Sequence, residues 1–149
     1  MTNTTIVVAS DHRGFKLKSE IIKYLKTINI NAIDYGTSST EKKVDYPKYA
    51  QKTAQAIQQQ QAEYGILICG SGTGMAIAAN RFKGVRAAIC FNKEYAQIVK
   101  QHNHANIMIF GANYITTQET LDCIKIFLGT KTEDKYMPRI DMLDNSNFG

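Results

Sequence analysis

With 149 residues, 44% of them hydrophobic, the chain is long enough for one domain with a substantial core, residues 1–149, ending in a C-terminal tail over about residues 130–149. Because no apolar run reaches the roughly 20 residues of a membrane helix, and Met1–Thr5 lacks the basic segment and apolar core of a signal peptide, we expect a cytoplasmic protein without a membrane partner. The net charge of +5 suits small anionic ligands, but the Lys and Arg residues are spread along the chain without a recognised binding motif, so we expect no nucleic-acid partner.

Short apolar runs alternate with segments of helical periodicity along the whole chain. Strands are predicted over residues 5–10, 32–35, 66–68, 85–90 and 106–110. The first helix is predicted from an apolar face that ends at Ile28, and the second begins near Pro47. Further helices are predicted up to Ala79, over residues 93–102 with Tyr95, Ile98, Val99 and His102 on one face, over residues 117–128 with Gly129 as the cap, and over residues 135–143.

Five alternations of strand and helix are typical of an α/β fold with an open, mostly parallel sheet and helices on both faces. In such sheets, ligands bind outside the carboxyl ends of the strands. Asp11 and His12 directly follow the first predicted strand, and Cys69–Gly74 follow the third. We therefore expect these two segments to converge on one site.

The stretch Tyr64–Asn80 combines a buried strand, three glycines alternating with hydroxyl residues, and a small apolar helix. This arrangement points backbone N–H groups and the positive end of a helix dipole at one place, which suits a phosphate or an oxyanion. Met75 stands where a dinucleotide-binding fingerprint has its last glycine, and no P-loop Gly-Lys-Ser/Thr follows. A tight turn that is rich in glycine for steric reasons alone is the alternative.

Cys69 lies at the rim of this glycine loop, where N–H donors would stabilise a thiolate. A thiolate here could act as a nucleophile or as a base that removes a carbon-bound proton, and the loop amides would stabilise the negative oxygens that develop beside the carbanion. A buried, inert cysteine is the alternative. We interpret Cys90 and Cys123 as reduced core residues, because three scattered cysteines form neither a disulfide framework nor a metal site.

Other polar residues permit both a functional and a structural interpretation. Asp11 could accept hydrogen bonds from a sugar hydroxyl and a protonated His12 could bind a phosphate, although both could simply cap a turn. His102 and His104 lack a third ligand at a suitable spacing, so we expect no metal site. Lys135 and Arg139 are four residues apart and would share one helix face, where they could bind a phosphate or form a solvated basic edge.

Six motifs occur together in one order: Ala9-Ser-Asp-His-Arg-Gly-Phe, Asp34-Tyr-Gly-Thr, Asp45-Tyr-Pro, Ile68-Cys-Gly-Ser-Gly-Thr-Gly, Ile77-Ala-Ala-Asn-Arg and Gln101-His-Asn. As a set they resemble ribose-5-phosphate isomerase type B, in a wider family that includes galactose-6-phosphate and allose-6-phosphate isomerases. The resemblance covers nearly the whole chain.

The resemblance implies a three-layer α/β/α sandwich with a five-stranded parallel sheet in the order 2-1-3-5-4. It implies an aldose–ketose isomerase of the non-oxidative pentose phosphate pathway, without metal or cofactor, which interconverts D-ribose 5-phosphate and D-ribulose 5-phosphate through a cis-enediolate. The implied assembly is a homodimer, or a dimer of dimers, with sites at the subunit interface. A hexose-6-phosphate (allose or galactose 6-phosphate) isomerase and a phosphate-binding regulatory module are the alternatives.

The resemblance also implies a role for each matching residue. Cys69 matches the base that moves the proton between C1 and C2, Ser71 matches a hydroxyl that helps to move the hydroxyl proton, and Asp11 and His102 match the pair that opens the sugar ring. The matching substrate-binding positions are His12, Tyr46, Gly70, Gly72, Thr73, Gly74, Asn103, Lys135 and Arg139. Some relatives use a glutamate at the position of Met75 instead of the cysteine. Asn113 and Lys135 stand where many relatives carry arginine.

Overall fold

The computed structural model describes residues 4–146; residues 1–3 and 147–149, which belong to the N-terminal segment and the C-terminal tail considered above, lie outside the described residues. The strands are β1 (Thr5–Ser10), β2 (Asn31–Asp34), β3 (Tyr64–Cys69), β4 (Ala87–Ile89) and β5 (Ile107–Gly111). The helices are α1 (Phe15–Thr27), α2 (Tyr46–Gln58), α3 (Thr73–Ala79), α4 (Lys93–Gln101), α5 (Thr117–Gly129), the 3-10 turn η1 (Asp134–Tyr136) and α6 (Met137–Asn145).

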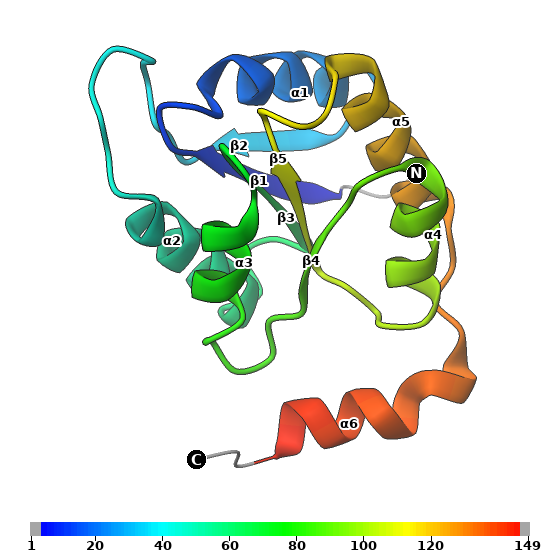
Figure 1. The fold of residues 1–149 in the computed structure, drawn as a ribbon. Coiled ribbons are helices and arrows are strands. Elements are labelled where there is room, and N and C mark those ends of the chain that lie inside the picture. Colours follow the sequence, from blue (N-terminus) through cyan, green and yellow to red (C-terminus); the bar gives the residue numbers. More distant parts are fainter. Residues whose placement is uncertain (1–3, 147–149) are drawn as a thin grey trace.

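All strand pairs are parallel, and the sheet order is β2-β1-β3-β5-β4. This confirms the predicted fold class and strand order. Helices cover both faces of the sheet (Figure 1): α1, α4 and α5 pack in one core cluster and α2 and α3 in the other. The sheet is therefore the middle layer of an α/β/α sandwich.

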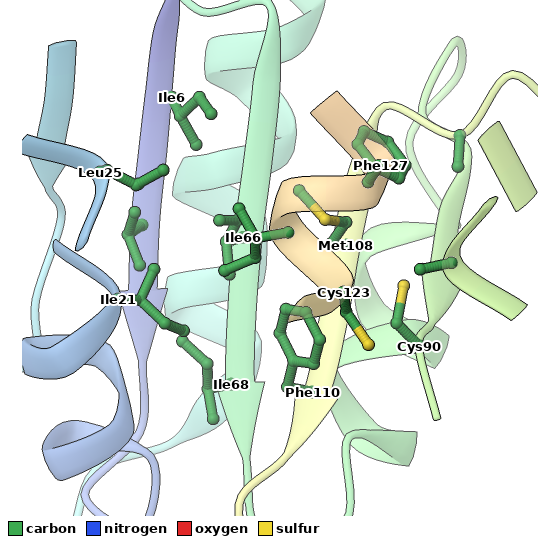
Figure 2. Packing of buried hydrophobic residues seen from close by; sticks show 14 of the residues in the cluster. Ile6, Ile21, Leu25, Ile66, Ile68, Cys90, Met108, Phe110, Cys123 and Phe127 are labelled. Carbon is green, nitrogen blue, oxygen red and sulfur yellow. The ribbon is translucent and has the colours of Figure 1, made fainter. Parts of the chain in front are cut away.

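The central strand β3 contributes side chains to both clusters, as the absence of polar alternation in its sequence predicted. Ile66 and Ile68 face α1 and α5, as Figure 2 shows, whereas Leu67 and Cys69 belong to the cluster beneath α2 and α3. In the same alternating way, Phe110 and Ile109 of β5 face opposite layers. The carboxyl ends of β1, β3 and β5 are consequently held in a rigid, fully packed frame.

Cys90 and Cys123 are buried in the cluster beneath α4 and α5, with exposed fractions of 2% and 0%, which confirms that they are core residues. Burial raises the pKa of the Cys90 thiol to about 12, with a smaller contribution from the neighbouring Cys123. Burial likewise raises the pKa of Cys123 to about 11. Both thiols are therefore neutral and unreactive at physiological pH.

Two predicted helix ends differ from the structure. Ile28 was expected on the buried face of the first helix, but α1 ends at Thr27, Ile28 is 40% exposed, and the next residue, Asn29, has a left-handed φ of 61° that ends the helix. Gly129 was expected to cap the fifth helix, but it lies inside α5, and Thr130 caps it by donating its N–H to the carbonyl oxygen of Phe127 at 3.2 Å.

The predicted apolar face of α4 was wrong in part: Val99 is buried as expected, but Tyr95 and Ile98 are exposed. Ala96 and Lys100, which were not predicted on that face, are buried instead. The Lys100 side chain is buried because its ammonium donates to the carbonyl oxygen of Phe127 at 3.1 Å and lies over two aromatic rings. A satisfied lysine thus replaces an aromatic residue on the packed face. The predicted strand over residues 85–90 pairs only over Ala87–Ile89, at the edge of the sheet.

The C-terminal segment is attached to the rest of the fold by few side chains. Its predicted helix is divided into η1 and α6, and within α6 only Ile140 is buried. An ion pair of 2.9 Å between Arg86 and Asp144 joins α6 to the segment before β4. Figure 1 shows α6 at the bottom of the view, apart from the sheet. None of the helices within residues 4–146 is long and apolar enough to cross a membrane.

Candidate active site

The β1–α1 turn and the β3–α3 loop meet at the carboxyl edge of the sheet, as the sequence predicts. Ser10 pairs with Ile68 in register, and the Asp11 N–H donates to the carbonyl oxygen of Ile68 at 3.2 Å. The Asp11 side chain is buried, and its Oδ1 accepts the N–H groups of Arg13 and Gly14 at 2.9 and 3.1 Å. Oδ1 therefore fixes the turn, while Oδ2 has no hydrogen-bond partner within residues 4–146.

The end of β2 supports the Asp11 turn from the other side. The Ser10 N–H donates to the carbonyl oxygen of Gly36 at 2.7 Å. Asp34 accepts the Gly36 N–H and pairs with the fully buried ammonium of Lys18, which lies 2.8 Å from each carboxylate oxygen. This ion pair joins α1 to β2 behind the turn. Asp34 of the Asp34-Tyr-Gly-Thr motif therefore has a structural contact.

His12 and Tyr46 border the same edge. The Nδ1 of His12 accepts the Val44 N–H at 3.2 Å, so a neutral His12 carries its proton on Nε2. Nε2 has no acceptor among residues 4–146 and can donate to a ligand. Tyr46 begins α2, and its ring packs directly on Gly74, where an added Cβ would lie 2.6 Å from the ring atom Cζ. The segment before α2 therefore contacts His12 through Val44 and leads into Tyr46, whose ring lies against the glycine loop.

The Cys69 thiol is enclosed by its own loop. Its exposed fraction is 5%, and its Sγ accepts the Gly72 N–H at 3.2 Å. Gly72 adopts a left-handed φ of 82°, which a residue with a side chain rarely adopts, and this conformation turns its N–H back to the sulfur. Negative charge on the sulfur would be stabilised by this donor.

Other groups of the loop remain available to a ligand. The carbonyl oxygens of Cys69 and Gly70 accept the N–H groups of Ala112 and Asn113 at 2.8 and 3.0 Å, which anchors the loop to the segment after β5. The exposed Ser71 uses its Oγ to accept the Thr73 N–H at 3.2 Å. No acceptor within residues 4–146 meets the N–H groups of Gly70, Ser71 and Gly74. A thiol beside free N–H donors is the arrangement that deprotonation next to a carbonyl group requires.

The remaining predicted site residues lie elsewhere, at the end of α4 and in the C-terminal segment. His102 follows the last residue of α4, and its ring stacks on Tyr136 with 4.4 Å between centroids and 28° between planes. Lys135 lies in η1 and contacts Glu133 at 3.5 Å, and Arg139 is exposed on α6. Asn103 is exposed beside His102. These four residues form a second group.

The group around Cys69 lies at the carboxyl ends of the strands, which we call the carboxyl edge of the sheet. The second group lies at their amino ends, the amino edge. Cys69 pairs with Gly111, the last residue of β5, whereas His102 precedes the first residue of that strand. The length of β5 alone, at about 3.3 Å per residue, separates these edges by about 13 Å. In Figure 1 the loops from β1 and β5 into α1 and α5 are at the top and α6 is at the bottom. One chain therefore does not bring the predicted residues together.

The described residues contain no group of three or more His, Cys, Asp or Glu side chains arranged to hold a metal ion. His104 has a structural contact instead: its Nε2 lies 3.0 Å from the carbonyl oxygen of Glu133. This contact fixes the segment before η1 to the end of α4.

A cavity of about 1100 Å³ lies beside α6, away from Cys69, between the β4 edge, α3 and α4. Phe91 and Leu143, which are 60% and 52% exposed, line it together with the second-group residue Asn103. The lining mixes these exposed hydrophobic side chains with charged ones, such as Arg81, Lys83 and Asp144, and it lies next to the second group.

Two residues that border the glycine loop were not among the predicted site residues. Arg13 was interpreted only as part of a turn, and Asn113 only as a replacement for arginine. In the structure both side chains lie against Gly70. The position of Arg13, directly after Asp11 and His12 at the end of a buried strand, was the available signal.

Comparisons with known proteins find similarity over nearly the whole chain. The sequence matches the family described as Ribose/Galactose Isomerase over residues 6–143. It is 37% identical over 139 residues to ribose-5-phosphate isomerase B of Escherichia coli strain K12, with 93% of each chain covered. The matched region contains both groups of predicted site residues.

Solved structures are similar over nearly the whole chain. A ribose 5-phosphate isomerase from Thermotoga maritima superimposes with a TM-score of 0.93 at 38% identity, over 97% of this chain and 100% of that chain. Ribose-5-phosphate isomerase B from Mycoplasma genitalium, solved with bound ribulose-5-phosphate, has a TM-score of 0.90 at 34% identity, over 95% of this chain and 94% of that chain.

Proposed function

Because this chain belongs to the ribose/galactose isomerase family, we propose that it is an isomerase that interconverts D-ribose 5-phosphate and D-ribulose 5-phosphate. One observation carries the proposal most directly: the Cys69 thiol lies in a loop whose Gly70, Ser71 and Gly74 N–H groups have no acceptor within residues 4–146. The whole chain acts as one sugar-phosphate isomerase domain. We place it in the cytoplasm, in the non-oxidative branch of the pentose phosphate pathway.

In the proposed mechanism, Cys69 as a thiolate removes the proton from C2 of the open-chain aldose. The electron pair of that C–H bond forms the double bond of a cis-enediolate, and the carbonyl oxygen becomes an oxyanion bound by the loop N–H groups. Ser71 assists transfer of the hydroxyl proton from O2 to O1, and Cys69 returns its proton to C1 to give the ketose. Met75, which is fully buried in the core, has no ionisable group, so Cys69 is the proposed base.

The remaining residues bind the substrate and prepare it for this step. Asp11, through its free Oδ2, and His102 open the sugar ring by moving protons between the ring oxygen and the anomeric hydroxyl. His12, Lys135 and Arg139 bind the phosphate, and Tyr46 and Asn103 contact the sugar. No metal or cofactor takes part in the proposed mechanism.

The second group reaches the first only from another copy of the chain. We therefore propose a homodimer, alone or paired into a tetramer, in which His102, Asn103, Lys135 and Arg139 of one copy complete the Cys69 site of the other. The positions of the two groups at opposite edges support this assembly. The exposed hydrophobic side chains of Phe91 and Leu143, which line one cavity beside the second group, also support it.

The test is conversion of ribose 5-phosphate to ribulose 5-phosphate by the native protein with a chelator present. We expect turnover that is unaffected by the chelator and higher than turnover of allose or galactose 6-phosphate. Greater activity on either hexose phosphate would assign the chain to that substrate instead. If none of the three sugars is converted and a nucleotide raises the melting temperature, the regulatory-module alternative replaces the isomerase.

A further inference from the structure

Two side-chain donors from different loops converge on Gly70. A Cβ placed on Gly70 would lie 3.1 Å from Cδ of Arg13 and 3.1 Å from Nδ2 of Asn113. Arg13 comes from the β1–α1 turn and Asn113 from the segment after β5, so the two loops meet over the residue that follows Cys69. The missing side chain of Gly70 is what allows both to approach the loop.

The Arg13 guanidinium has a fixed stem and a free end. The backbone N–H of Arg13 is held by Asp11 at 2.9 Å, and its stem crosses Gly70 with one terminal nitrogen 3.8 Å from the same Cβ position. Among residues 4–146, no carboxylate pairs with Arg13 and no acceptor meets the side-chain amide of Asn113. Arg86, by contrast, has an ion pair and two carbonyl acceptors.

Converging donors without acceptors favour an anion. A planar guanidinium presents several N–H groups that match a phosphate in two-point contact, and an exposed amide can add a further donor. His12, whose Nε2 is free to donate, is the neighbour of Arg13 in the same turn. Three donors, one of them permanently charged, thus border the glycine loop on one side.

We propose that Arg13, assisted by Asn113, binds the phosphate group of the sugar phosphate and so is a further substrate-binding residue of this site. This inference rests on the proposed function, because it takes a sugar phosphate as the ligand. Asn113 is neutral, so the positive charge in this pair comes from Arg13, which belongs to the same chain. Its contact is made with the phosphate, which does not react, so it binds the substrate and the transition state equally.

The kinetic test compares native protein with Arg13→Gln and Arg13→Ala in the ribose 5-phosphate assay. Loss of hydrogen bonds to a charged group is expected to raise KM by about 10- to 100-fold, with kcat changed by less than roughly threefold because uniform binding is lost. Lys26→Ala removes the same charge from the exposed far end of α1 and is the matched control, with KM unchanged. A fall in kcat at constant KM would overturn the phosphate assignment.

A second measurement does not depend on turnover. Inorganic phosphate is titrated by calorimetry into native protein and into the Arg13→Gln and Lys26→Ala variants, with melting curves to show that each is folded. We expect weaker binding by about 10-fold or more for Arg13→Gln alone. Equal binding by all three overturns the Arg13 proposal even if the isomerase is active, whereas phosphate binding that depends on Arg13 without isomerase activity would refute only the proposed reaction.

Discussion

The carboxyl and amino edges of the sheet, where the strands end and begin, differ in how firmly they hold the predicted site residues. At the carboxyl edge, Cys69 and Asp11 are buried and sit in loops whose backbone groups bond to one another across β1, β3 and β5. At the amino edge, Lys135 and Arg139 are exposed on the C-terminal segment, and Ile140 is the one buried residue of its helix α6. One chain thus contains a rigid loop with the proposed base and a loosely attached segment with the proposed phosphate-binding residues.

This difference fits the demands of the proposed reaction. Proton transfer at carbon requires the base and the oxyanion donors to be fixed within a fraction of an ångström. Phosphate binding by long cationic side chains tolerates more movement, because charge and reach matter more than exact placement. In the proposed reaction the rigid edge therefore carries the chemistry, and a second copy contributes the loosely held edge.

The largest effect is expected from the rigid edge. Cys69→Ala should lower kcat for ribose 5-phosphate by about 10²- to 10⁴-fold, the usual contribution of a general base. Cys123→Ala is the control, because it removes a thiol from the core and should lower stability while activity persists. Full activity in Cys69→Ala would refute Cys69 as the base but not the proposed isomerase activity.

Mixing two inactive variants tests whether Cys69 of one copy and His102 of another form one site. Cys69→Ala and His102→Ala each inactivate both sites of a symmetric dimer, but a mixed dimer has one site with both native residues. After unfolding and refolding together at equal amounts, activity should return to about a quarter of the native value, since half of the dimers are mixed. No recovery would mean that one chain supplies both residues or that the chains do not exchange.

A steric change beneath the loop tests its rigidity. A Cβ on Gly111 would lie 2.5 Å from the carbonyl oxygen of Ser71, so Gly111→Ala must displace the glycine loop. We expect a stability loss of about 1–3 kcal/mol and activity lower by up to about 10²-fold, measured by urea unfolding and turnover. Gly129→Ala is the contrast: nothing lies within 4 Å of its Cβ, and alanine in this exposed helical position should stabilise by about 0.5–1 kcal/mol.

The buried thiols of Cys90 and Cys123 should make the protein less stable at alkaline pH. The pKa values of Cys90 and Cys123 are raised by burial to about 12 and about 11, whereas an unfolded thiol has a pKa of about 8.5. Above about pH 8.5 the unfolded chain loses protons that the folded chain keeps, so the free energy of unfolding should fall as pH rises toward 11–12. Urea unfolding at several pH values should show that the free energy of unfolding falls less steeply with pH in Cys90→Ala. An unchanged pH dependence would contradict the raised pKa of Cys90.

The smallest effect is expected at the attachment of α6. Asp144→Asn removes the ion pair with Arg86, and such partly exposed pairs contribute about 0–1 kcal/mol. Hydrogen exchange should become faster in residues 137–145, with little change in β3 or in the global unfolding free energy. An equal loss of protection in both regions would mean that the edges are more tightly coupled than their contacts indicate.

The position of His102 shows where the sequence reasoning stopped. Grouping it with Asp11 came from the resemblance, and the motif predicted a role for it without its location in space. A helix that crosses between parallel strands returns the chain to the amino edge, so a residue at the end of α4 lies away from residues that follow strands. The α4 face failed for another reason: a buried Lys100 satisfied by Phe127 cannot be recognised from apolar spacing.

The sequence by itself determined the alternation of strands and helices, the burial of β3 on both faces, and the meeting of Asp11 with the Cys69 loop, because each follows from local periodicity and from the rule that parallel strands end at one edge. The strand order came from the family resemblance. Only the tertiary structure decided that Arg13 and Asn113 meet over Gly70, and that the second group lies a strand length away. Such contacts join residues far apart in the chain, and their distance depends on how the layers pack rather than on any spacing within the sequence.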